Sequence, residues 1–148
     1  MPKKHVFLSY VRENAPDVEI LRNDLIGLGE AVWWDQDIPV GAKWKLEIRK
    51  ALKDAYAFVL CLSKAMEGRD WAGAFPEILD AIAIYRELAP GRIFITPVRL
   101  DDCEIPSFEI DANAMLGDLH FVDFFPPSKR PDGLRRLVAS LQRCPGHP

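Results

Sequence analysis

The chain has 148 residues, of which 49% are hydrophobic and 28% charged, with a formal net charge of −3. This length predicts a single domain over residues 1–148 with a full hydrophobic core, and the composition excludes a disordered or fibrous chain. The mild negative charge argues against direct binding of nucleic acid, because neutralising phosphates takes a basic surface.

Features of export and membrane insertion are not found in the sequence. The longest apolar run, Ala55 to Leu62, is too short to cross a bilayer, and the first residues lack the apolar stretch of a secretory signal. The cysteines at positions 61, 103 and 144 form no close pair and are expected to be buried or incidental thiols in a reducing compartment. We therefore expect a soluble cytoplasmic protein that does not act on membranes.

The first third of the chain alternates strand-like and helix-like segments. Residues 5–10 predict a strand, and residues 30–35 predict a second one that leads into a turn-rich segment over 36–41. Between the two strands, a helix is predicted from Asp17 to Gly29. Four residues at helical spacing mark its expected apolar face: Val18, Leu21, Leu25 and Leu28.

The middle of the chain continues the alternation. Helices are predicted over residues 44–55 and from about Phe75 to Leu88, with Pro76 in the first turn of the latter. Between these helices, residues 56–62 form a continuous apolar run, which is typical of a central parallel strand buried on both faces.

The last third is less regular. Strands are predicted over residues 92–98 and 119–124, separated by an irregular acidic segment over 99–118. A tail over residues 144–148 is expected to be frayed. Before it, four apolar residues predict a closing helix: Leu134, Leu137, Val138 and Leu141.

Alternating strands and helices predict an α/β fold with a five-stranded parallel sheet and helices on both faces, a flavodoxin-like three-layer sandwich. In such sheets, ligands bind at the carboxyl ends of the strands. The residues expected to converge there are Ser9, Tyr10, Arg12, Asp35, Asp37, Gly41, Trp44, Ser63, Asp70, Trp71 and Glu77.

Several common uses of this architecture lack their residues. The turn after the first strand has no glycine, which argues against a dinucleotide-binding fingerprint or a P-loop. The third strand ends in Cys61-Leu62-Ser63, where a phospho-acceptor domain needs an aspartate. No Gly-x-Ser-x-Gly elbow occurs. The scattered histidines at positions 5, 120 and 147 and the dispersed cysteines predict no metal site.

Three segments resemble the signature boxes of Toll/interleukin-1 receptor (TIR) domains. Phe7-Leu8-Ser9-Tyr10 resembles the first box, and Asp35 to Gly41 resembles the loop after the second strand. Val59 to Ser63, followed by Trp71 and a Glu-led helix, is similar to the third-strand region of bacterial NAD-cleaving members. The resemblance covers about residues 5–143.

The resemblance implies one of two functions. Some TIR domains are NAD+ nucleosidases, which hydrolyse NAD+ to nicotinamide and ADP-ribose or a cyclic isomer. If the chain resembles these members, it is expected to be an effector of a bacterial immune or antiphage response. It implies no cofactor and no metal. Activation would come from self-assembly with other TIR domains through residues 36–43, driven by a sensor outside this chain. The other implied function is that of a non-enzymatic TIR adaptor, which acts by TIR–TIR association. A nucleoside-processing transferase of related fold is a further alternative outside the TIR family.

Glu77 is the catalytic residue that the resemblance implies. Cleavage of the bond between nicotinamide and ribose passes through an oxocarbenium-like transition state, which a nearby carboxylate can stabilise. The macrodipole of a helix favours an anion in its first turn, so we expect Glu77 to stay ionised. The alternative is an ordinary first-turn glutamate.

The resemblance also implies a set of substrate-binding residues. Trp44 is expected to stack on a flat ring, although its helical spacing equally fits core packing. Arg12 is expected to meet a phosphate, or else to pair with Glu13 or Asp17. Many relatives carry a tryptophan four residues before the glutamate, whereas Trp71 lies six before it here. The full substrate-binding set is Ser9, Tyr10, Arg12, Asp37, Gly41, Trp44, Ser63 and Trp71.

Overall fold

A computed structural model describes residues 3–148, apart from the side chains of residues 71 and 72. Its main sheet has five parallel strands in the order β2-β1-β3-β4-β7, which confirms the predicted flavodoxin-like α/β fold. The strands are β1 (His5–Ser9), β2 (Val32–Trp33), β3 (Ala55–Leu62), β4 (Ile95–Arg99) and β7 (Val122–Asp123).

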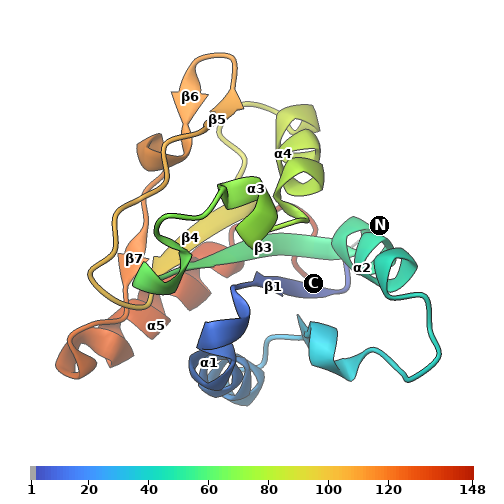
Figure 1. Cartoon of the computed structure of the whole chain (residues 1–148), viewed down its shortest axis with the longest axis horizontal. Helices are drawn as coiled ribbons and strands as arrows, with labels where there is room; N and C mark the ends of the chain where they lie inside the picture. Colours follow the sequence, from blue (N-terminus) through green and yellow to red (C-terminus); the bar gives the residue numbers. More distant parts are fainter. Residues whose placement is uncertain (1–2) are drawn as a thin grey trace.

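Helices cover both faces of this sheet (Figure 1). On one face, α1 (Ala15–Gly27) and α5 (Arg130–Leu141) contribute buried leucines to the core. On the other, α2 (Trp44–Lys53) and α4 (Ile78–Glu87) pack through Leu52, Ile78 and Ile82, and the short α3 (Trp71–Ala74) precedes α4. The 3-10 helices are η1 (Arg12–Asn14), η2 (Asp35–Asp37), η3 (Lys64–Met66), η4 (Leu116–Asp118) and η5 (Pro127–Lys129).

The central strand β3 contributes side chains to the hydrophobic cores on both faces of the sheet. All eight of its residues are buried, as the apolar run predicted. Phe58, Leu60 and Leu62 belong to the core under α2 and α4, whereas Val59 and Cys61 belong to the core under α1 and α5. Because side chains alternate across a strand, one apolar run supplies both cores.

Several predicted boundaries are wrong. The strands predicted over residues 30–35 and 119–124 are shorter, and the fourth strand begins at Ile95, not at residue 92. The third predicted helix begins at Ile78, not near Phe75, and the short α3 precedes it as a separate helix. Leu28 lies past the end of α1 and is exposed. Pro76 falls in the break between the two helices, where its missing N–H interrupts no helical hydrogen bond.

The segment over residues 99–118 is not wholly irregular. It contains an antiparallel pair, β5 (Glu109–Asp111) and β6 (Ala114–Met115), beside α4. The pair is held by the fully buried side chains of Ile110 and Leu116, the apolar anchors of an otherwise polar stretch.

The carboxyl-terminal tail forms hydrogen bonds with the rest of the protein, which contradicts the expected fraying. His147 Nε2 lies 3.1 Å from Oε2 of the buried Glu30, and the Tyr56 hydroxyl donates to that same oxygen at 2.5 Å. The Lys3 N–H also donates to the Gly146 carbonyl at 2.8 Å. A buried carboxylate needs partners, and the tail supplies one.

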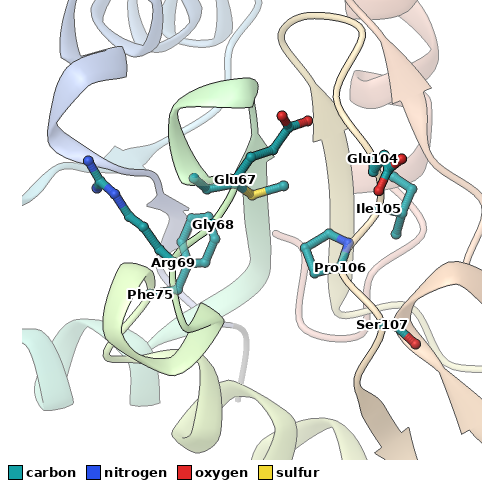
Figure 2. A pocket seen from close by; sticks show the side chains of 9 residues that line it. Glu67, Gly68, Arg69, Phe75, Glu104, Ile105, Pro106 and Ser107 are labelled. Atoms are coloured by element: carbon teal, nitrogen blue, oxygen red, sulfur yellow. The ribbon is translucent and has the colours of Figure 1, made fainter.

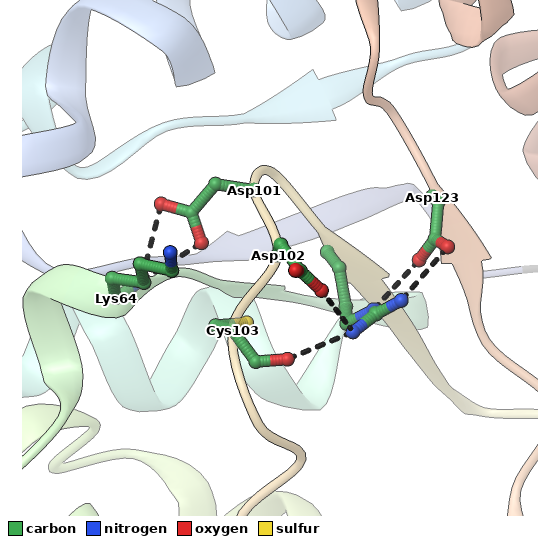
Figure 3. Close-up of polar contacts among 6 residues, drawn as sticks. Lys64, Asp101, Asp102, Cys103 and Asp123 are labelled. Atoms are coloured by element: carbon green, nitrogen blue, oxygen red, sulfur yellow. Dashed lines mark hydrogen bonds and ion pairs between the residues drawn. The ribbon is translucent and has the colours of Figure 1, made fainter.

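Arg99 organises the carboxyl end of β4 (Figure 3). Its guanidinium donates two hydrogen bonds to the Asp123 carboxylate of β7, at 2.7 and 2.9 Å, and one to the Cys103 carbonyl at 2.8 Å. The rings of Phe121 and Phe125 lie 5.0 and 5.1 Å from it. This arrangement fixes the short edge strand β7 and the loop after β4.

Candidate functional site

Glu77 meets the end of β1, although 68 residues separate the two in the chain. The Ser9 hydroxyl donates to Glu77 Oε1 at 2.5 Å, and Ser9 itself is buried. Glu77 lies directly before α4, between the fully packed side chains of Phe75 and Ile78. Core packing on both sides therefore fixes the backbone that carries this carboxylate.

The environment of Glu77 disfavours its charged form. Burial raises the pKa of this carboxyl, the hydrogen bond from Ser9 opposes the shift, and the carboxylates of Asp35 and Asp80 raise the pKa further. Burial and the neighbouring carboxylates therefore oppose the favourable effect of the helix N-terminus, and the ionised state of Glu77 stays a prediction.

A hydrogen-bonded chain beside Glu77 joins the ends of β1 and β2. The Tyr10 hydroxyl donates to Asp35 Oδ1 at 2.6 Å and accepts from Trp34 Nε1 at 2.7 Å. Burial and Asp35 raise the pKa of the Tyr10 phenol, which keeps its proton for this donation. Tyr10 is thus a tether that holds Asp35 close to Glu77.

Asp37 forms an ion pair with a residue of α1. Its carboxylate lies 3.3 Å from the Arg22 guanidinium of α1, which also stacks on the Trp34 ring at 5.3 Å. This ion pair joins the segment after β2 to α1. Asp37 was predicted to bind substrate; in the structure its carboxylate pairs with Arg22, and its contact with substrate stays a prediction.

A cavity of about 430 Å³ is lined by Tyr10 and Pro76, the chain neighbours of Ser9 and Glu77, but not by Ser9 or Glu77 themselves. Arg12 is exposed there and forms no ion pair with any described residue, so the predicted pairing with Glu13 or Asp17 is wrong. Glu13 pairs with Arg69 at 2.5 Å. The lining residues are Tyr10, Val11, Arg12, Arg69, Asp70, Gly73, Ala74 and Pro76.

Ser63 points into the protein. Its hydroxyl donates to Asn14 Oδ1 at 2.5 Å, and both residues are buried. The contact ties the end of β3 to η1, which carries Arg12. Ser63 therefore positions the cavity wall and does not line it.

Gly41 and Trp44 lie in and after the loop that follows β2. Gly41 has a positive φ of 89°, which suits glycine, and Trp44 is 56% exposed. The alternative prediction that Trp44 packs in the core is therefore wrong. Neither Gly41 nor Trp44 lines the cavity of about 430 Å³. The side chain of Trp71, also predicted to bind substrate, lies outside the described part of the chain.

Arg69 was not among the site residues predicted from the sequence. It lies in the turn after η3 and lines both the cavity beside Glu77 and a neighbouring one of about 510 Å³. Figure 2 shows the second cavity with Arg69 and Phe75 on one wall and Ile105 and Pro106 on the other. An arginine directly before Asp70-Trp71 was the available signal.

The site has no residues arranged for a metal. Among the described residues, no group of three or more His, Cys, Asp or Glu side chains could hold a metal ion. No helix in the same part of the chain is long and apolar enough to cross a membrane.

A family comparison accounts for this arrangement. The TIR domain family matches the chain over residues 6–138. The chain belongs to the TIR domain family. This match confirms the family that the three signature boxes indicated, while the bacterial NAD-cleaving subtype stays a prediction.

The solved structure of a TIR domain supports the fold. The TIR domain of the Toll-related receptor TRR-2 from Hydra magnipapillata superimposes with a TM-score of 0.69 at 16% identity, covering 93% of this chain and 97% of that one. The TIR domains of the activated Roq1 resistosome, which recognises the effector XopQ, match at 24% identity with a TM-score of 0.49, covering 66% of this chain and 58% of that one. No curated protein sequence matches significantly.

Proposed function

We propose that this TIR domain is an NAD+ nucleosidase whose catalytic group is the Glu77 carboxylate. The observation that carries the proposal is the Ser9–Glu77 pair at the carboxyl edge of the parallel sheet, beside a cavity lined by Arg12 and Arg69. Ligands of open α/β sheets bind at this edge.

The reaction breaks the bond between the nicotinamide nitrogen and the ribose carbon. Nicotinamide leaves as a neutral molecule with the bonding electron pair, positive charge develops on the ribose, and water adds to the ribose carbon and loses a proton. Ser9 holds Oε1 of Glu77, while Oε2 has no hydrogen bond from any other described side chain. That oxygen is available to accept from a ribose hydroxyl and to stabilise the developing charge.

The two arginines suit the remainder of the substrate. Arg12 is exposed and free of ion pairs with the described residues, and Arg69 is half-exposed in its pair with Glu13. A guanidinium binds phosphate oxygens in a fixed fork, so the NAD+ diphosphate would lie between them. NAD+ is then a substrate, with no further cofactor and no metal.

The decisive experiment measures nicotinamide release from NAD+ at high protein concentration. Glu77→Gln preserves the Ser9 contact but removes the charge, and we expect release to fall by about 10²-fold or more. Glu87→Gln is the matched control, since Glu87 is exposed at the far end of the same helix. Equal release by Glu77→Gln and the wild type, with both folded, would overturn the assignment.

Self-association is the second part of the proposal. The loop after β2 and the start of α2 present three exposed apolar side chains: Val40, Trp44 and Leu46, which are 106%, 56% and 45% exposed. Such a cluster favours contact with another protein surface. In this proposal the domain is a cytoplasmic bacterial immune effector, and a sensor outside this chain brings its copies together.

Concentration dependence tests this second part. We expect nicotinamide release per molecule to rise with protein concentration, and Val40→Asp to abolish that rise. Ile20→Asp is the control, because Ile20 is a similarly apolar and exposed residue on α1. A constant rate per molecule would contradict activation by assembly. Assembly without nicotinamide release at any concentration would identify an adaptor instead.

A further inference from the structure

A third cavity lies at the other end of the sheet from Glu77. It has a volume of about 540 Å³ and follows the first part of β4, the segment over residues 119–122 and the last turns of α5. It exists because β7 is short. β7 pairs with β4 only at Val98 and Arg99, so Ile95 to Pro97 has no strand neighbour on this side.

The walls of this cavity carry unneutralised positive charge. Arg92, Arg136 and Arg143 line it, and no aspartate or glutamate does. None of these three arginines forms an ion pair with a described residue, although the chain as a whole has a net charge of −3. The Arg136 guanidinium lies 3.2 Å from Nε2 of His120.

Other arginines of the same chain form ion pairs with aspartates. Arg99 pairs with Asp123, Arg130 with Asp24, and Arg135, next to Arg136 on α5, with Asp132. Three arginines that converge on one hollow without a counter-charge raise the positive potential there and attract anions.

The rest of the lining suits a small organic anion. Tyr85, Ile93 and Phe121 supply apolar surface, and Ser140 supplies a hydroxyl. The volume falls within the range of about 300–1,000 Å³ that is usual for small-molecule sites. Guanidinium groups match the geometry of phosphate oxygens better than an ammonium group does.

We propose that this basic cavity, defined by Arg92, Arg136, Arg143 and His120, binds a small soluble compound that carries two or more linked phosphates. Its phosphates would lie among the arginines and its apolar part against Tyr85 and Phe121. The site is separate from the Glu77 cavity, with which it shares no lining residue. The proposal therefore holds or fails independently of NAD+ cleavage.

Titration calorimetry with inorganic tripolyphosphate at physiological salt tests this site. We expect saturable binding at one site per chain. Arg136→Gln combined with Arg143→Gln should weaken it at least tenfold. Arg135→Gln is the matched control on the same helix and should bind within twofold of the wild type. Thermal melts establish that each variant is folded.

Two further variants keep the outcome unambiguous. Arg92 lies in an exposed turn before β4, so Arg92→Gln tests the site without disturbing α5 and should also weaken binding. Arg12→Gln, in the Glu77 cavity, should leave binding unchanged. No saturable binding, equal losses in the Arg135→Gln control, or a loss confined to Arg12→Gln would each overturn the proposal.

Discussion

Glu77 is held in a setting that resists its ionisation, and this has a measurable effect on stability. Burial raises the pKa of Glu77 above its usual value, so the folded state holds the proton more tightly than the unfolded state does. The resulting contribution to folding is fully present below the ordinary glutamate pKa. It is lost as pH rises through the raised pKa of the folded state.

Glu77→Gln removes this dependence. We expect the free energy of unfolding of Glu77→Gln to gain on the wild type as pH rises from about 4 to about 8, because only the wild type must then ionise a partly buried carboxyl. Urea unfolding at several pH values measures the difference. The exposed Glu87→Gln should show no such trend, and a pH-independent difference for Glu77→Gln would contradict the burial argument.

The cysteines make a second test at the scale of single residues. All three are free and buried, and burial raises the pKa of Cys61 and of Cys144 to about 12 and that of Cys103 to about 11. Because the thiolate is the reactive form, we expect none to be alkylated in the folded protein at about pH 8. Mass spectrometry after iodoacetamide treatment, with and without urea, would show this. Rapid labelling of the folded chain would contradict it.

The packing of α5 against the edge of the sheet depends on Gly133. A Cβ at this position would lie 2.6 Å from the Asp123 carbonyl oxygen and 2.8 Å from Cδ1 of Phe124. We expect Gly133→Ala to destabilise the protein by about 1–3 kcal/mol, despite the better helix propensity of alanine.

Gly27→Ala is the matched control for this prediction. Gly27 also lies in a helix, and a Cβ there would have no neighbour within 4 Å. It should be neutral or stabilising by up to about 1 kcal/mol. Chemical unfolding of both variants measures the contrast, and equal effects would show that α5 can move away from β7 without loss.

The sequence predicted the long central elements better than the edges. β3 has eight buried residues and a continuous apolar run, so its pattern is unambiguous. β2 and β7 have two residues each, and tertiary pairing defines them more than local pattern does. The β5–β6 pair depends on Ile110 and Leu116, two apolar positions that show no period among turn residues.

The candidate site was predictable where topology alone decides it. Ser9 and Glu77 follow from parallel strands whose carboxyl ends share one edge. The partners of Ser63 and Tyr10 depend on side-chain direction, which periodicity does not encode. The raised pKa of Glu77 depends mainly on its burial, which only the assembled fold determines.

At the scale of the whole molecule, the tail contributes to stability. His147 lies against the buried carboxylate of Glu30, which also accepts from Tyr56. We expect His147→Ala to destabilise the fold by about 1–3 kcal/mol, because it removes one partner of a buried carboxyl group. Chemical unfolding of His147→Ala, Glu30→Gln and the double variant completes a cycle. Strictly additive effects would show that the two side chains do not interact.

Arg99 contacts residues that belong to two different cavities. Its guanidinium holds the Cys103 carbonyl, and the following residues, Glu104 to Ser107, form a wall of the cavity that Arg69 borders. The same guanidinium stacks on Phe121, which lines the basic cavity at the far end of the sheet. A ligand that displaced the Phe121 ring would therefore remove one contact of the same guanidinium that binds the Cys103 carbonyl at the carboxyl edge.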